Sequence, residues 1–120
     1  MRKKMVQFLD LLEVNWKKCP WIKEQSPEFM LSELEKEVEE VRAELKSGDK
    51  KKLKHELGDI GWDYFNLLVL AEKRKGVRMK DVFSGLMRKV RHRKPYLFEK
   101  GRISTGEAVR IWKKQKKKEH

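Results

Sequence analysis

The sequence predicts an all-α protein of four to five helices, arranged as an antiparallel helical bundle that dimerisation completes. Apolar residues recur three and four positions apart, the spacing of one helix face, and no segment shows the period of two that is typical of strands. Short polar connections between these segments favour antiparallel neighbours. The segment from Ile60 to Ala71 is apolar on most of its circumference, so it needs cover on more than one side. In 120 residues, which fit a single domain over residues 1–120, a second subunit would provide that cover.

The first two helices are expected on either side of a short loop. Apolar residues at helical spacing predict the first helix over about residues 2–16. The sequence Cys19-Pro20-Trp21 then breaks the pattern and is expected to form a loop. Ser26 is a favoured N-cap residue and Pro27 suits the first helical position, so the second helix begins there. It ends at the sequence Ser47-Gly48-Asp49.

Two further helices follow from similar start and stop signals. The third is expected over about residues 50–75, because Asp49 can cap its start and Gly76 stops it. The fourth is expected over about residues 79–93, and Pro95 ends it.

A short fifth helix is expected near the C-terminus. The sequence Ser104-Thr105-Gly106-Glu107 is a capping box, and the apolar spacing that follows it continues to Trp112. The basic tail, about residues 113–120, is a run of like charge with no apolar anchor, and we expect it to be frayed.

The charge is large and unevenly distributed. The formal net charge is +12, made up of +3 for residues 1–25, −4 for residues 26–63 and +13 for residues 64–120. A basic balance indicates a polyanionic partner, which could be nucleic acid, a membrane surface or a phosphorylated small molecule. No apolar run approaches the roughly 20 residues of a membrane span, and the single cysteine, Cys19, excludes an intrachain disulfide. We therefore expect a cytoplasmic protein that does not enter the membrane.

The acidic middle segment carries two stripes of carboxylates. One stripe lies on the expected second helix and the other on the third, each at the border of an apolar face; they comprise Glu33, Glu37, Glu40 and Glu44, and then Glu56, Asp59, Asp63 and Asn66. If the two helices pack antiparallel, Glu37 and Glu40 face Glu56 and Asp59. Carboxylates this close stay ionised together only with a cation, and oxygen ligands suit Mg²⁺ or Mn²⁺.

Other interpretations of these stripes remain open. Acid-rich helix faces are commonly just solvated, and periodicity alone favours that interpretation. A ferritin-like di-iron site requires Glu-x-x-His pairs, which His55 and His92 are not placed to supply.

Five motifs, in order along residues 17–118, resemble those of MazG-type nucleoside triphosphate pyrophosphohydrolases. The first two are the opening Cys19-Pro20-Trp21-Ile22-Lys23-Glu24-Gln25-Ser26 and the acidic Glu37-Val38-Glu39-Glu40-Val41. The others are Glu56-Leu57-Gly58-Asp59, then Arg93-Lys94-Pro95-Tyr96-Leu97-Phe98, and finally Glu107-Ala108-Val109 followed by Trp112 and Lys116.

The resemblance implies an all-α, usually dimeric enzyme that hydrolyses an NTP to the NMP and pyrophosphate with Mg²⁺ as cofactor. It implies that Glu37, Glu40, Glu56 and Asp59 are the metal ligands, and we favour Glu40 as the residue that orients or deprotonates the attacking water. It implies that the nucleotide is bound by Trp21, Lys89, Arg93, Trp112 and Lys116, although packing is an equally good interpretation of Trp21. The sequence departs from the family pattern at Ile22, Lys36, Trp62, Asp63 and Lys94. The metal-binding motif is intact, and the departures at Ile22, Asp63 and Lys94 bear on substrate preference.

Two alternatives to this function follow from the same residues. A related all-α pyrophosphatase would act on dUTP, dCTP or phosphoribosyl-ATP. A basic helical nucleic-acid-binding protein would account for the net charge of +13 over residues 64–120. A dedicated binder would have no use for acidic stripes, which repel phosphates in the absence of a metal, so nucleic acid is not expected to be the main partner.

Overall fold

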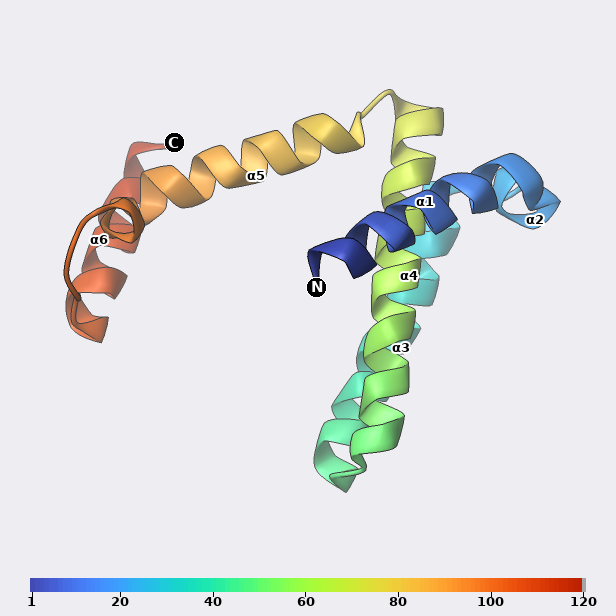
Figure 1. Ribbon diagram of the computed structural model, residues 1–120, viewed down its shortest axis with the longest axis horizontal. Helices are drawn as coiled ribbons and strands as arrows, with labels where there is room; N and C mark the ends of the chain where they lie inside the picture. The colour runs from blue at the N-terminus through green and yellow to red at the C-terminus, as the bar shows by residue number, and fades with distance from the viewer. Residues whose placement is uncertain (120) are drawn as a thin grey trace. The chain divides into compact units, whose positions relative to one another are not determined.

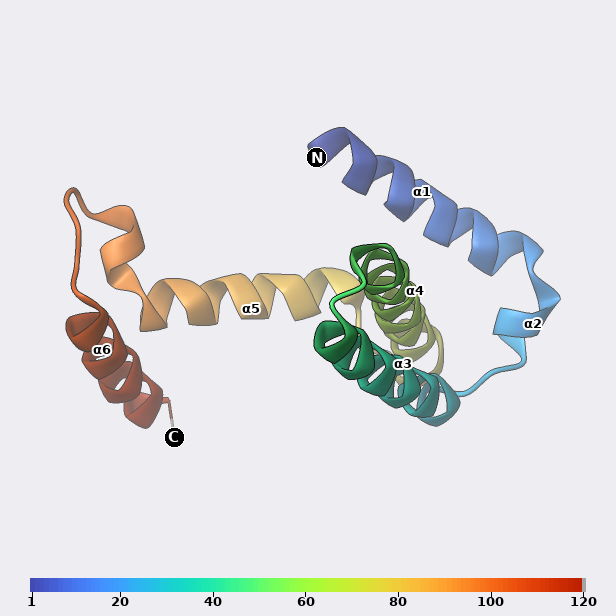
Figure 2. The same cartoon turned by 90° about the horizontal axis from the view of Figure 1, so that it is seen from below.

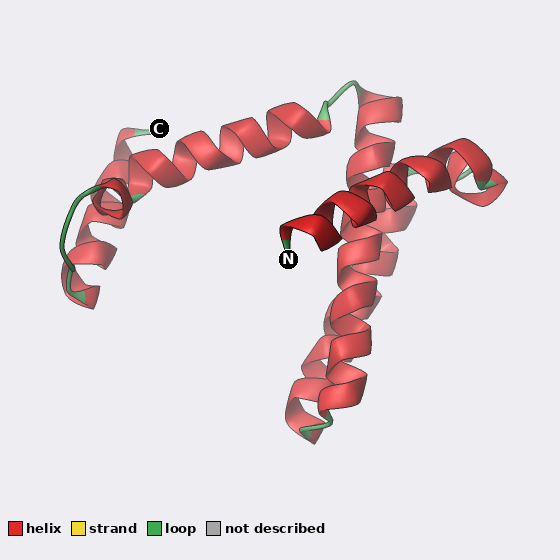
Figure 3. Cartoon of the chain, in the orientation of Figure 1, coloured by secondary structure: helices red, strands yellow, loops and turns green. Residues whose placement is uncertain are grey.

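A computed structural model describes residues 1–119, and all of its regular structure is helical (Figures 1 and 3). It contains six α-helices and one 3₁₀ helix and, over the described residues, no strand. The all-α prediction is confirmed. The chain divides into two compact units, an N-terminal unit from Met1 to Arg78 and a C-terminal unit that begins at Met79. The single domain over residues 1–120 stays a prediction. No helix within residues 1–119 is long and apolar enough to cross a membrane.

The N-terminal unit begins with helices α1 (Arg2–Lys18), α2 (Pro20–Lys23) and α3 (Pro27–Ser47). The short α2 replaces part of the expected loop. Cys19 is extended and ends α1, and the fixed φ of Pro20 then suits a new helical turn. Ser26 caps α3 as predicted, because its Oγ accepts a hydrogen bond from the Phe29 N–H at 3.1 Å.

Helices α3 and α4 (Lys50–Lys75) form an antiparallel pair, and they lie side by side in both views (Figures 1 and 2). Gly48 ends α3 at a φ of 76°, a left-handed conformation that glycine adopts without steric cost. Asp49 caps α4 by accepting a hydrogen bond from the Lys52 N–H at 3.0 Å. The connection of two residues favours antiparallel neighbours, as the sequence predicts.

The core of the N-terminal unit lies where α2, α3 and α4 meet. Ile22, Met30 and Leu70 form a buried cluster, against which Trp16, Cys19 and Leu67 pack. Helix α1 contacts α4 through Phe8, whose ring meets those of Trp62 and Phe65 edge to face. Buried Asn66 of α4 accepts a hydrogen bond from Asn15 of α1 at 3.3 Å and donates one to the Trp62 carbonyl at 3.0 Å.

The C-terminal unit consists of α5 (Met79–Arg93), the 3₁₀ helix η1 (Pro95–Phe98) and α6 (Thr105–Lys118). Ser104 caps α6 as predicted, since its Oγ accepts from the Glu107 N–H at 3.2 Å. The prediction of a frayed tail is wrong for residues 113–118, because α6 continues through Lys118. The ion pair of Glu119 with Arg93, at 2.8 Å, ties down the end of this helix. His120, the last residue of the predicted tail, lies outside the described residues.

Candidate metal site

The antiparallel packing of α3 and α4 brings the predicted acids together. Oxygen atoms of Glu37 and Glu40 on α3 and of Glu56 on α4 all lie within 4.8 Å of one another. Glu56 also belongs to a second group with Asp59 and His55, whose ligand atoms lie within 4.8 Å of one another. Each helix places its two acids three positions apart, so both acids of a pair fall on one face. The four acids together are called the acidic centre below.

Two carboxylate oxygens of the acidic centre lack a partner. Oε2 of Glu37 and Oε2 of Glu56 are buried and form no hydrogen bond. Buried polar atoms are normally satisfied, because leaving one unpaired costs the free energy of its lost hydration. A cation bound between the two helices would satisfy both oxygens at once.

The acidic centre also raises the pKa values of its own groups. Burial raises the pKa of Glu37, the contact with the Glu56 carboxyl offsets part of this rise, and the negative charges of Glu40, Asp59 and Asp63 add to it. The neighbouring carboxyl of Glu56 raises the pKa of Glu40, by hydrogen bonding and by charge. Without a metal, this arrangement therefore favours uptake of a proton, and a divalent cation would remove the repulsion.

The ligand set fits a hard divalent cation. The acidic centre offers carboxylate oxygens only, and Mg²⁺ binds through a few carboxylates while water and phosphate oxygens complete its coordination. Glu37, Glu56 and Asp59 are half-buried, and Glu40 is exposed. Glu40 is therefore the member best placed to contact water.

The other carboxylates of the two acidic stripes lie outside the acidic centre and have surroundings of their own. Lys36 pairs with Glu33 at 3.0 Å, so this departure from the family pattern neutralises an acid of the α3 stripe. Glu44 accepts a hydrogen bond from the Ser47 hydroxyl at 3.0 Å. Burial raises the pKa of Asp63, and the charges of Glu33 and Asp59 add to the rise.

His55 is a neighbour that sequence reasoning did not assign to the site. Its Nε2 lies 3.3 Å from Oδ2 of Asp59, one helical turn further along α4. The i,i+4 spacing of the two residues was the available signal. The sequence does not place His55 in a di-iron site, and the structure places it beside a predicted magnesium ligand.

Trp21 is the one predicted nucleotide-binding residue in the N-terminal unit. It lies on α2 and is 50% exposed. Its indole meets the ring of Phe29 edge to face, with the centroids 5.9 Å apart. The contact supports the packing interpretation, while the exposed half of the ring leaves room for a ligand.

The other four predicted nucleotide-binding residues lie in the C-terminal unit. Lys116 Nζ is 4.8 Å from the centroid of the Trp112 ring, and the guanidinium of Arg93 is 6.0 Å from it. Lys89 lines an opening together with Arg88, His92 and Glu119. Arg93 and Lys116 thus both lie at the ring of Trp112.

Glu119 is a partner of Arg93 that no sequence motif indicated. Its carboxylate accepts hydrogen bonds from Arg93 Nε and from the adjacent guanidinium nitrogen. Hydrogen bonding to Glu119 raises the pKa of Arg93, and the same bond lowers the pKa of Glu119. Arg93 therefore has an anionic partner of its own within the unit.

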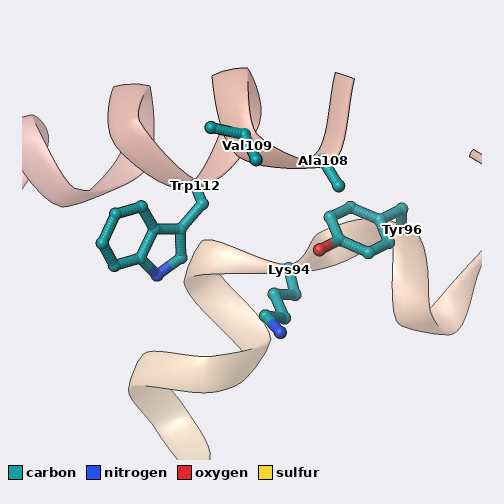
Figure 4. A pocket seen from close by; sticks show the side chains of 5 residues that line it. All are labelled: Lys94, Tyr96, Ala108, Val109 and Trp112. Atoms are coloured by element: carbon teal, nitrogen blue, oxygen red, sulfur yellow. The ribbon is translucent and has the colours of Figure 1, made fainter. Parts of the chain in front are cut away.

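A pocket of about 230 Å³ opens beside Trp112 (Figure 4). Lys94, Tyr96, Ala108 and Val109 complete its lining, with Tyr96 and Trp112 supplying two aromatic side chains. Lys94 is a position at which the sequence departs from the family pattern, so this departure changes the wall of a pocket that Trp112 shares.

Known proteins resemble the chain over the regions that carry these features. The sequence pattern of the MazG nucleotide pyrophosphohydrolase domain matches residues 25–98. The crystal structure of a mazG-related protein from Thermotoga maritima is 36% identical in sequence and superposes with a TM-score of 0.88. That similarity covers 92% of this chain and 97% of the Thermotoga chain. None of the curated proteins matches the chain.

Proposed function

The chain belongs to the MazG nucleotide pyrophosphohydrolase family, and on that premise we propose that it hydrolyses nucleoside triphosphates to the monophosphate and pyrophosphate with Mg²⁺. The observation that carries the proposal is the acidic centre, in which Glu37 and Glu56 each bury an oxygen without a partner. Four carboxylates between two helices suit the ion that accompanies a triphosphate. Removal of unwanted nucleotides from the cytoplasmic pool is the role that this activity would serve.

Each member of the acidic centre has a proposed role. Glu37, Glu40, Glu56 and Asp59 would hold Mg²⁺, or Mn²⁺ in its place. The bound ion would polarise a phosphoryl group and lower the pKa of an attacking water. Glu40 would orient that water and accept its proton, because its exposed carboxylate can reach solvent.

The proposed nucleotide contacts come from aromatic and basic side chains. Lys89 and Arg93 would neutralise charge on the phosphates, for which Arg93 would exchange Glu119 for a phosphate oxygen. Trp112, which Lys116 already contacts, would stack on the base. Trp21 would offer its exposed half to the nucleotide.

We also propose that the enzyme is a homodimer or a higher homo-oligomer. The buried apolar side chains are few for a unit of four helices, namely Leu12, Ile22, Met30, Leu68, Val69 and Leu70. Helix α1 leaves several large apolar side chains exposed, namely Val6, Leu9, Leu11 and Val14. Burial of such side chains against a second copy would stabilise both subunits. Sedimentation that showed a folded monomer at micromolar concentration would contradict this proposal.

A narrower substrate range is the second candidate, and the pocket beside Trp112 favours it. Lys94 and Tyr96 supply polar groups to its wall, and such groups can discriminate between bases or sugars by hydrogen bonding. The related activities towards dUTP, dCTP or phosphoribosyl-ATP would then replace a broad activity towards NTPs.

A substrate panel tests these proposals directly. Purified protein would be incubated with Mg²⁺ and each ribonucleoside and deoxyribonucleoside triphosphate, with pyrophosphate and phosphate measured separately. We expect one pyrophosphate for each monophosphate formed, and no reaction in the presence of EDTA. Stepwise release of phosphate, or turnover that does not require a divalent ion, would contradict the proposed reaction.

A further inference from the structure

Helix α6 carries four cations on its outer face, named here the basic stripe: Arg110, Lys113, Lys114 and Lys117. All four side chains are exposed. An α-helix turns by about 100° per residue, so the four side chains together cover only about 100° of the circumference of α6. The half-buried residues of α6 lie on the opposite side, and Figure 4 shows one of them, Trp112, lining the pocket with Lys94 and Tyr96. The basic stripe is therefore separate from the face that packs within the unit.

The basic stripe has no anionic partner among residues 1–119. None of its four cations forms an ion pair with a carboxylate of the described chain, whereas Arg93 in the same unit is paired with Glu119. From Met79 onward the sequence holds fourteen Lys and Arg residues against four Asp and Glu residues. Like charges three and four positions apart repel one another and weaken a helix. An anionic ligand would remove that repulsion.

The length of the stripe indicates a ligand with several regularly spaced negative charges. Arg110 and Lys117 are about 10 Å apart along the helix axis, at about 1.5 Å per residue. A strand of duplex DNA carries one phosphate per about 3.4 Å of axis, so about three phosphates would lie along this length. The stripe contains none of the residues proposed to bind the nucleotide substrate.

We propose that the basic stripe of α6 binds the phosphodiester backbone of nucleic acid, separately from the hydrolytic site. Backbone contacts of this kind are independent of base sequence and weaken steeply with salt, because each neutralised phosphate releases counterions.

The test is the salt dependence of binding to fluorescently labelled oligonucleotides of 20 nucleotides, one single-stranded and one duplex. The test variant combines Arg110→Gln, Lys113→Gln, Lys114→Gln and Lys117→Gln. We expect the slope of log K against log salt to fall in magnitude by about 2 for the single strand, at about 0.7 for each of about three phosphates. The oligonucleotide that the parent binds more tightly identifies the form of nucleic acid that the stripe prefers.

A matched control removes the same charge from the N-terminal unit. Lys50→Gln, Lys51→Gln, Lys52→Gln and Lys54→Gln alter four exposed lysines that spread over about 200° of helix α4. This variant should keep the parental slope to within about one. Pyrophosphate release and the circular dichroism spectrum should be unchanged in both variants.

Three results would overturn the proposal. The parent could fail to bind either oligonucleotide at low salt, or both variants could lose the same slope, which would show that net charge rather than the stripe governs binding. A loss of pyrophosphate release in the α6 variant would show that the stripe serves the nucleotide site.

Discussion

The two units of the chain arrange their charges in opposite ways. The N-terminal unit has a net charge of only +2, but it concentrates carboxylates between α3 and α4, where two of their oxygens are buried. The C-terminal unit has a net charge of +10 and keeps the four cations of the basic stripe on an exposed face. Charges gathered between helices cost stability unless a ligand compensates them, whereas like charges on an exposed helix face repel one another only weakly. The first arrangement fits the ion site proposed above, and the second fits the proposed binding surface for nucleic acid, whose affinity should depend on salt.

The largest expected effect is the loss of activity on changing the acidic centre. Glu37→Gln, Glu40→Gln, Glu56→Gln and Asp59→Asn should each reduce kcat/KM by about 100-fold or more, since even outer-shell partners of a bound metal cost about 10- to 100-fold. Pyrophosphate release measures this loss.

The controls lie on the same α3 stripe outside the acidic centre. Glu33→Gln and Glu44→Gln should retain most of the activity. Glu33 already pairs with Lys36, and Glu44 already accepts a hydrogen bond from Ser47. Equal losses in all six variants would mean that the stripe acts only through general electrostatics. Full activity in the four variants of the centre would make the proposed metal site wrong.

A smaller effect is expected on the stability of the metal-free protein. Glu37→Gln should raise the melting temperature at pH 7. Burial and the neighbouring acids make the ionised form of Glu37 unfavourable in the folded protein, and the substitution removes this charge. The gain should disappear as the pH falls towards 4.5, since Glu37 of the parent then takes up a proton. Mg²⁺ should raise the melting temperature of the parent more than that of the variant. A lower melting temperature for the metal-free variant would contradict the repulsion inferred here.

The C-terminal unit should respond to acid with the opposite sign. Hydrogen bonding to Arg93 lowers the pKa of Glu119 in the folded protein, so the pair stabilises the fold above the ordinary value of 4.5 and is lost as the pH falls through the lowered pKa. Glu119→Gln should therefore lower the melting temperature slightly at pH 7, and the difference should vanish in acid. The side chains of Arg93 and Glu119 are 24% and 20% exposed, so salt should weaken the effect only in part. A difference that persists in acid would show that the carboxylate charge is not its cause.

The smallest effect is expected at Cys19. Its side chain packs against the cluster formed by Ile22, Met30 and Leu70. Cys19→Ser should keep turnover within a few-fold of the parent, as measured by pyrophosphate release. Complete loss would assign the thiol a role in the chemistry.

The sequence was informative where local chemistry alone decides the structure. Ser26, Gly48 and Asp49 end or begin helices through their own backbone and side-chain preferences, and the structure has α3 and α4 at the predicted positions. The antiparallel pairing of these helices also brought Glu37, Glu40 and Glu56 together, as their spacing predicts.

The sequence was less informative where distant contacts decide the structure. The extension of α6 to Lys118 accompanies the pair between Arg93 and Glu119, residues 26 positions apart that no periodic pattern connects. Tyr96 joins the pocket with Trp112 through the turn of η1, which the sequence did not predict. The i,i+4 spacing of His55 and Asp59 predicts that the two side chains meet. The acidic pattern by itself indicates only the carboxylates.

The most direct test of the central claim is the position of the metal in a crystal of the protein soaked with Mn²⁺. We predict an anomalous difference peak between α3 and α4, bounded by the carboxylates of Glu37, Glu40, Glu56 and Asp59. A peak at another group of acids, or no peak at the acidic centre in crystals of active enzyme, would contradict the claim that these four residues hold the catalytic ion.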